Sequence, residues 1–175
     1  MRGGLLICKI ISGYYTFLFF RKFYYFLCIL KHVYIVRRFT PSDIAEIIEI
    51  ANDSLTERYF PQLFIDIYES WPEGFLVADF HGILGFIAGS KMANEARILM
   101  LAVRKNYQRK GIGSALMKKF MSVCKSEGLL SIRLEVRTTN YEAIEFYKKF
   151  GFNIISFIPN YYTNGDAAYV MWRMI

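Results

Sequence analysis

The loop Gln108–Gly113, QRKGIG, is the clearest candidate for chemistry in this chain. It follows an apolar run and precedes a stretch with helical spacing, so its glycines are expected at the start of a helix. A helix N-terminus exposes unpaired N–H groups and carries about half a positive charge, so it can bind phosphate through its backbone. Glycines let the backbone approach an anion closely, and Arg109 and Lys110 add positive charge. The loop therefore predicts a phosphate-binding turn.

Spacing excludes two common phosphate loops. The P-loop pattern G-x-x-x-x-G-K-[ST] is absent, and Leu116 occupies the third glycine position of a dinucleotide-binding fingerprint. A metal site is not expected either, because His32 and His81 are the only histidines and lie far apart in the sequence.

The three cysteines, Cys8, Cys28 and Cys124, form no paired framework and no C-x-x-C motif. This usage predicts a cytoplasmic chain with free thiols.

The segments around the loop predict one mixed α/β domain. Thr40 is expected to cap the first helix, Gly128 to end the third, and His81-Gly82 to form a hairpin turn. The apolar run 97–103 is expected to be a strand covered on both faces. Strands are expected at 33–39, 74–80, 83–92, 97–103, 131–139, 151–158 and 167–175, and helices at 40–54, after Pro61, at 111–127 and at 140–150.

Charge is distributed unevenly along the 175 residues. Residues 1–32 contain nine aromatic and five basic residues and no acidic residue, whereas residues 33–175 carry 17 Lys or Arg against 15 Asp or Glu. The basic excess belongs mainly to the N-terminal extension, so a nucleic-acid partner is not expected.

The extension 1–32 contains uncharged runs of eleven and eight residues, separated by Arg21-Lys22. A spanning helix needs about 20 apolar residues, and the first alanine of the chain is Ala45, so neither a membrane span nor a secretory cleavage site is expected. Three interpretations remain. The segment lies on a membrane surface, or it is an arm packed on the domain or on a neighbour, or the start codon is assigned too early and native translation begins near Val33. We favour the third and do not expect membrane contact.

Several segments carry a resemblance to a known family. QRKGIG matches the Q/R-x-x-G-x-G/A signature of the GNAT acetyltransferases, whose loop grips the pyrophosphate of acetyl-CoA. LEVRTTNYEAIEFYKKFGF (134–152) resembles the strand and helix that follow in N-terminal protein acetyltransferases of the RimI type and the NatA catalytic subunit. NYYTNGDAAYVMWRMI (160–175) and SLTERYFPQLFIDIYESWPEGFLVAD (54–79) are similar to other parts of the same enzymes. The resemblance covers 33–175 and omits 1–32.

The resemblance implies a GNAT fold, with a mostly antiparallel sheet of about seven strands flanked by about four helices. It also implies acetyl-CoA as a co-substrate and a set of residues that contact it. These are Leu101, Ala102 and Val103 at a strand end, Gln108, Arg109, Lys110, Gly111, Ile112, Gly113 and Ser114 in the loop, and Asn140, Phe146 and Lys149 on the next helix.

Three residues are catalytic candidates by resemblance. Tyr147 would protonate the departing thiolate, although it also fits a core stripe of its helix. Glu57 would position or deprotonate the amine through water, although a lone loop glutamate is usually solvated. Glu135 is the second candidate base, although its alternation with Arg133 and Arg137 is also typical of a surface ion-pair row.

Arg97 departs from relatives that carry Tyr or His at that strand position. An arginine cannot serve as a base at neutral pH. The departure therefore shifts the expected base to Glu57 or Glu135.

The residues expected to bind the acceptor come from two loops. Tyr161 and Tyr162 resemble the tyrosines that hydrogen-bond the substrate backbone near its N-terminus, and Leu55, Thr56 and Tyr59 would face them. Adjacent loop tyrosines are otherwise common packing residues.

The predicted reaction is direct transfer of acetyl from acetyl-CoA to the α-amine of a protein N-terminus, without an acetyl-enzyme. An α-amine with a pKa near 7.7–8.0 is roughly one-tenth free base at pH 7, so a weak base suffices. Two alternatives stay open: a GNAT enzyme for a small-molecule amine, and a non-catalytic acyl-CoA-binding subunit. Ribosomal proteins or nascent chains are the candidate partners, and a monomer or weak dimer is expected.

Overall fold

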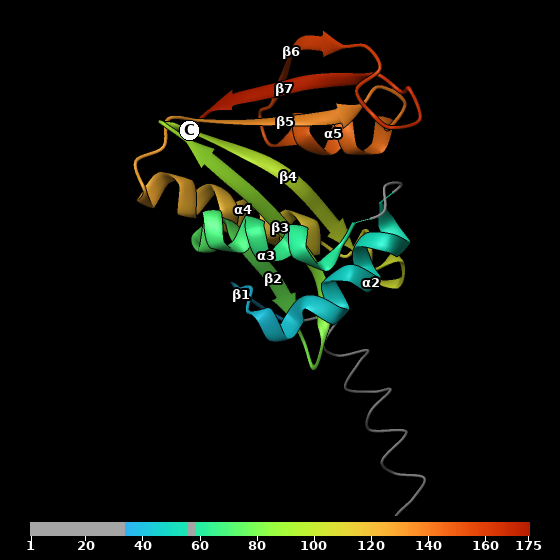
Figure 1. Cartoon of the computed structure of the whole chain (residues 1–175). Coiled ribbons are helices and arrows are strands. Elements are labelled where there is room, and N and C mark those ends of the chain that lie inside the picture. The colour runs from blue at the N-terminus through green and yellow to red at the C-terminus, as the bar shows by residue number, and fades with distance from the viewer. Residues whose placement is uncertain (1–33, 56–58) are drawn as a thin grey trace, which may run out of the picture. The chain divides into compact units, whose positions relative to one another are not determined.

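A seven-stranded sheet in the order β1-β2-β3-β4-β5-β7-β6 organises the chain (Figure 1). The computed structural model describes residues 34–55 and 59–175, so the extension 1–32 and the expected site residues Thr56 and Glu57 lie outside the described residues. The strands are β1 (Ile35–Arg38), β2 (Phe75–Asp79), β3 (Ile83–Met92), β4 (Glu95–Val103), β5 (Ser131–Arg137), β6 (Asn153–Ile158) and β7 (Ala168–Met174).

Neighbouring strands are antiparallel except β4 and β5, which are parallel. The helices are α2 (Ile44–Ser54), α3 (Pro61–Ser70), α4 (Ile112–Ser126) and α5 (Tyr141–Lys149). This confirms the predicted mostly antiparallel sheet with four helices. None of the helices in the described segments is long and apolar enough to span a bilayer.

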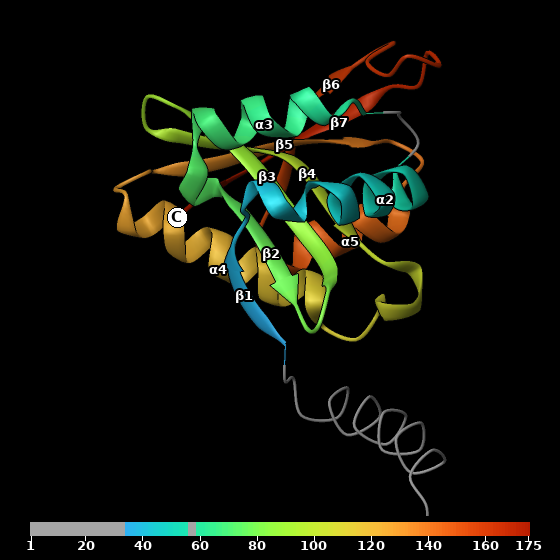
Figure 2. The same cartoon turned by 60° about the horizontal axis from the view of Figure 1, so that its bottom comes forward.

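Two hydrophobic layers sandwich the sheet. On one face, α2 and α3 bury Ile47, Ile50 and Phe64 with strand residues that include Met100 and Ala102. On the other face, Phe120 of α4 packs against Trp71, with ring centroids 5.5 Å apart. Figure 2 shows the four helices distributed on both sides of the sheet.

The predicted turns are confirmed, and three short 3₁₀ turns were not foreseen. His81 and Gly82 have φ values of 50° and 139° at the β2–β3 turn, and Gly128 ends α4 with φ 72°. The 3₁₀ turns η1 (Pro41–Asp43), η2 (Pro72–Gly74) and η3 (Lys105–Tyr107) each occupy one turn. Two of them begin at proline, whose fixed φ suits the first position of a helical turn.

The prediction that 97–103 is covered on both faces is wrong for part of β4. Leu99 is 38% exposed and Arg97 is half-buried, whereas Ile98 and Met100 are buried. The cause is a β-bulge: Ala88 pairs with Met100 and Gly89 with Ile98, so Leu99 is an extra residue on β4. A Cβ on Gly89 would lie 2.7 Å from the Phe120 ring, so this position faces α4 and requires glycine.

Candidate active site

The parallel strands β4 and β5 pair over only part of their length. Their register joins Glu95–Ile98 to Ser131–Leu134, and the strands then diverge toward Val103 and Arg137 (Figure 1). The divergence leaves the β4 edge at Leu101, Ala102 and Val103 without a β5 partner. Backbone groups along such an edge can hydrogen-bond an extended ligand arm.

The loop from β4 to α4 forms the predicted turn at the open end of this gap. Gln108 donates from Nε2 to the Val103 carbonyl at 3.0 Å, which ties the loop to the strand end. Arg109 and Gly111 both have left-handed backbones, with φ 62° and 87°. Lys110 donates from Nζ to the Asn106 carbonyl at 2.7 Å.

The N-terminus of α4 suits a phosphate group. No side chain caps it, so the first-turn N–H groups at Ile112, Gly113 and Ser114 point out of the helix without a side-chain acceptor. A Cβ on Gly113 would make ordinary 3.8 Å contacts with Phe146 and Val103, so packing within the protein does not require glycine there. The missing side chain leaves room for a ligand, and the residues fit a diphosphate.

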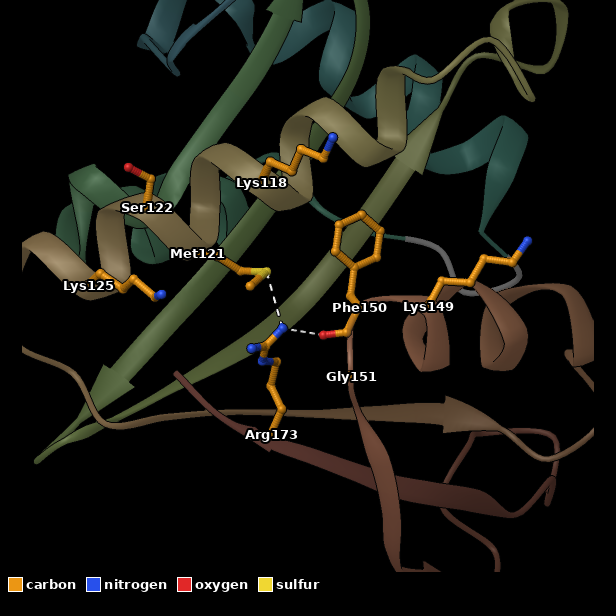
Figure 3. Close-up of a pocket in the computed structure, with 8 residues that line it drawn as sticks. All are labelled: Lys118, Met121, Ser122, Lys125, Lys149, Phe150, Gly151 and Arg173. Atoms are coloured by element: carbon orange, nitrogen blue, oxygen red, sulfur yellow. Dashed lines mark hydrogen bonds between the residues drawn. The ribbon is translucent and has the colours of Figure 1, made fainter.

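Helix α5 lies beside this turn, and the helix and its N-cap carry the three residues Asn140, Phe146 and Lys149 that are predicted to contact the coenzyme. Phe146 borders Gly113 and packs against Tyr147, with ring centroids 5.4 Å apart. The Asn140 side chain caps α5 by accepting from the Ala143 amide at 3.1 Å, which gives this residue a structural role beside the predicted coenzyme contact. Lys149 lies at the C-terminal end of α5 and lines a pocket that also includes residues of α4 and β7 (Figure 3).

Tyr147 is buried, and burial is the main cause of its raised pKa, with a smaller contribution from Tyr162. The hydroxyl therefore stays protonated well above neutral pH. A neutral phenol can donate a hydrogen bond or a proton to an anionic leaving group.

Glu135 is an acidic residue of β5 and lies on the face of the sheet opposite α4. Its side chain is only 4% exposed. Arg97 Nε donates to Oε2 at 2.8 Å, and Arg133 Nε donates to Oε1 at 2.9 Å. The predicted ion-pair row is present for Arg133 and Glu135, whereas Arg137 binds Asp166.

The β6–β7 loop places two tyrosines above these charges. The Tyr161 hydroxyl accepts from Arg97 Nη2 at 3.0 Å. Arg137 stacks on the Tyr162 ring with 3.8 Å from its guanidinium carbon to the centroid. Burial raises the pKa of Tyr162 to about 12, so this hydroxyl is also neutral at physiological pH.

The predicted residues from separate segments meet at Tyr162. Tyr59, Tyr147 and Glu135 all lie within electrostatic reach of this side chain. Tyr59 and Leu55 also pack against the hydrophobic core below α2 and α3. The structure therefore brings together residues from the segment between α2 and α3, from β5, from α5 and from the β6–β7 loop.

Arg137 is the main contact residue that the sequence analysis did not assign to the site. It was recognised only as part of a charged row, yet it holds Tyr162 by stacking and binds Asp166 of the same loop. The period-two alternation that places Arg137 on the Glu135 face was the available signal.

Comparisons with known proteins identify the family of this chain. The model of the acetyltransferase (GNAT) family matches residues 44–152. The chain belongs to the GNAT acetyltransferase family.

Relatives of this GNAT chain include proteins named N-alpha-acetyltransferase. A Sulfolobus acidocaldarius N-alpha-acetyltransferase is 30% identical over 152 residues, which cover 79% of this chain and 90% of the relative. The crystal structure of Ard1 from Thermoplasma volcanium is 49% identical, has a TM-score of 0.80, and covers 81% of this chain and 97% of its own. Arabidopsis thaliana Naa50, in complex with the bisubstrate analogue CoA-Ac-MVNAL, is 27% identical, with a TM-score of 0.73 and coverage of 81% and 99%.

Proposed function

We propose that this protein transfers the acetyl group of acetyl-CoA to the α-amine of protein N-termini. The observation that carries the proposal is the meeting of two features on diverging strands: an uncapped, glycine-bearing helix start on one side and a tyrosine-bearing loop on the other. The relatives named for N-terminal acetylation support this choice of acceptor.

Acetyl-CoA would enter as the second substrate and supply the reactive thioester. The α4 N–H groups and the loop Gln108–Gly113 would hold its diphosphate. The backbone of β4 at Leu101–Val103, which does not pair with β5, would align the pantetheine arm and place an N–H near the oxyanion formed by attack.

Glu135 would accept a hydrogen bond from the incoming amine. Two guanidinium donors occupy part of its acceptor capacity, but a carboxylate offers about four lone-pair sites, so two remain for an amine or water. The hydrogen bond would position the amine, and water would carry its proton away. Glu57, which lies outside the described residues, is the second proposed base.

Tyr147 would act on the leaving group. Its raised pKa keeps the proton on the phenol at working pH, and transfer to the departing thiolate completes the exchange. The amine attacks the thioester carbon, and the tetrahedral intermediate collapses with loss of the CoA thiolate. The proton that the attacking nitrogen releases to water balances the one that Tyr147 donates and later regains, so no acetyl-enzyme intermediate is needed. Buried Cys124, whose thiol pKa is raised by burial, offers no nucleophile here.

Tyr59, Tyr161 and Tyr162 would form the walls of a slot for the substrate backbone. Aromatic walls with hydroxyl groups suit a peptide better than a polyamine, which calls for an open acidic pocket. Nascent chains and ribosomal proteins in the cytoplasm are the proposed acceptors.

An acetyl-transfer assay tests the acceptor. The panel contains peptides that vary the first two residues, a peptide with a blocked N-terminus and a free lysine side chain, and spermidine. We expect kcat/KM for free N-termini to exceed the other two by at least tenfold. Preference for spermidine would overturn the peptide acceptor, and acetyl-CoA binding with no transfer to any acceptor would indicate a non-catalytic subunit.

A further inference from the structure

The outer edge of β6 is an exposed apolar strand. β6 is the last strand in the order of the sheet, and Figure 1 shows it beside β7 at the end of the sheet. Within the described residues, β7 is the only strand with which β6 pairs. Residues 153–157 are all exposed, including Ile154 at 43%, Ile155 at 56% and Phe157 at 53%. Because an edge strand also presents unpaired backbone N–H and C=O groups, β6 offers a partner both hydrogen bonds and apolar contacts.

No charged side chain protects this edge. Residues 150–165 contain no Lys, Arg, Asp or Glu, whereas the 21% charged fraction of the chain would place about three among these sixteen residues. Edge strands are commonly protected from pairing by charged residues or by proline. The proline of this stretch, Pro159, follows the end of β6. Two copies of this edge can therefore approach each other without charge repulsion.

The opposite edge of the sheet has the protection that β6 lacks. β1 exposes Ile35, but two of its four residues are arginines. Arg37 binds Asp43 at 2.7 Å. Arg38 binds Glu73 at 3.2 Å, and its side chain is mostly exposed. Charged side chains along an edge disfavour pairing with a further strand, so of the two edges of the described sheet β6 is the one that suits a partner.

The size of the apolar patch sets the strength expected for such a contact. The side chains of Ile154, Ile155 and Phe157 expose on the order of 300 Å² per copy, which is similar to the largest apolar patch of a typical monomer. Ile155 is an extra residue on β6 relative to β7, so a β-bulge limits the length of edge that can pair. Contacts of this size belong to the small interfaces, below about 1,200 Å² in total, of weak and reversible complexes.

The edge is complementary to itself, which favours a second copy as the partner. Neutral apolar side chains on one edge match those on the other, and antiparallel pairing about a two-fold axis places the middle of one strand against the middle of its mate. We propose that two copies of this chain associate through β6, with Ile155 of each copy close to the axis and the two sheets joined into one. None of these residues belongs to the proposed acetyl-transfer site, so the proposal does not rest on the proposed function.

Sedimentation velocity of the full chain over the micromolar range tests the association. The variant is Ile155→Lys, which places a charge on β6. The matched control is Ile35→Lys on β1, where the isoleucine has a similar exposure, 61% against 56%. We expect a monomer–dimer equilibrium in the wild type that is at least tenfold weaker in Ile155→Lys and within twofold of the wild type in Ile35→Lys. Because both positions are exposed, the thermal unfolding midpoints should not change.

Three results would overturn the proposal. The first is a wild type that stays monomeric over the whole range. The second is an association that Ile155→Lys leaves unaffected, because the contact would then lie on another part of the chain. The third is an equal loss in Ile35→Lys, because the effect would then come from added charge rather than from β6.

Mixing oppositely charged variants tests the two-fold arrangement. Ile155→Lys and Ile155→Glu should each be monomeric, because like charges would meet near the axis. An equimolar mixture should recover association, and low salt should strengthen it, because the lysine of one copy would face the glutamate of the other. A mixture that stays monomeric would overturn the pairing of β6 with β6. Acetyl transfer is not a readout here, so its absence would contradict only the proposed function.

Discussion

Arg97 joins Glu135 to Tyr161. One guanidinium donates through Nε to the carboxylate at 2.8 Å and through Nη2 to the phenol oxygen at 3.0 Å. A strand residue that cannot be a base thereby connects the proposed base to the proposed peptide slot. Arg97 therefore has a structural role at the proposed site.

Replacing Arg97 with alanine should impair peptide use. Loss of both hydrogen bonds frees Tyr161 and removes one of the two cations on Glu135, so we expect KM for peptide to rise and kcat to fall, each by roughly tenfold. Arg97→Lys should recover only part of the loss, because lysine lacks the planar fork. Steady-state kinetics measure the effect, and Arg38→Ala, in an exposed ion pair with Glu73, is the control. Equal effects of Arg97→Ala and Arg38→Ala would contradict this role.

Replacing Tyr147 with phenylalanine should lower kcat by roughly tenfold to a hundredfold and leave acetyl-CoA affinity within about twofold. The ring packing stays, and only the hydroxyl is lost. We expect the same separation for Glu57→Gln. Turnover and calorimetric affinity provide the two readouts, and parallel losses in both would show that these residues are structural.

The pH dependence of kcat/KM should rise through the pKa of the acceptor amine, near 7.7–8.0, and then reach a plateau. The pKa of Tyr147 is raised above its ordinary value of 10.0, so its proton is retained throughout the plateau. The rate should not decline below about pH 10 through ionisation of this group. A decline centred near pH 8.5 that disappears in Tyr147→Phe would show that the phenol is more acidic than its burial predicts.

Gly111→Ala and Gly128→Ala form a matched pair at the two ends of α4. Both glycines have left-handed φ values, 87° and 72°, so each substitution should cost about 1 kcal/mol of unfolding free energy. Only Gly111→Ala should also raise the Kd for acetyl-CoA, by about fivefold or more, because only this residue borders the proposed diphosphate site. Denaturant unfolding and calorimetry separate the two effects. A similar Kd in both variants would argue against phosphate binding at this turn.

Asn140→Asp distinguishes capping from ligand contact. Aspartate caps a helix as well as asparagine does, so stability should be kept, whereas Asn140→Ala should lose about 1 kcal/mol. A new negative charge beside coenzyme phosphates should weaken acetyl-CoA binding several-fold. If Asn140→Asp binds as the wild type does, Asn140 acts through the helix cap alone.

Local patterns in the sequence predicted much of the fold. The four helices and seven strands follow from periodicity and from caps such as Gly128, which act within a few residues. The 3₁₀ turns and the bulge at Leu99 depend on contacts between distant segments. No local rule places Gly89 against Phe120.

The sequence predicted which residues belong to the candidate site better than it predicted their hydrogen-bond and ion-pair partners. The loop Gln108–Gly113 and the tyrosine pair carry recognisable motifs. The partners of Arg97 and Arg137 depend on how the β6–β7 loop folds back over the sheet, and short-range spacing does not encode that.

The bulge at Leu99 decides which face of the sheet carries Arg97. Ile98 pairs with Gly89, which faces α4, so Arg97 emerges on the opposite side with Glu135. Regular pairing at the same strand length would instead place Leu99 opposite Gly89 and Arg97 opposite Lys91, which would turn Arg97 toward α4 and away from the carboxylate. One unpaired residue, rather than strict alternation, therefore decides which β4 side chains face the proposed site.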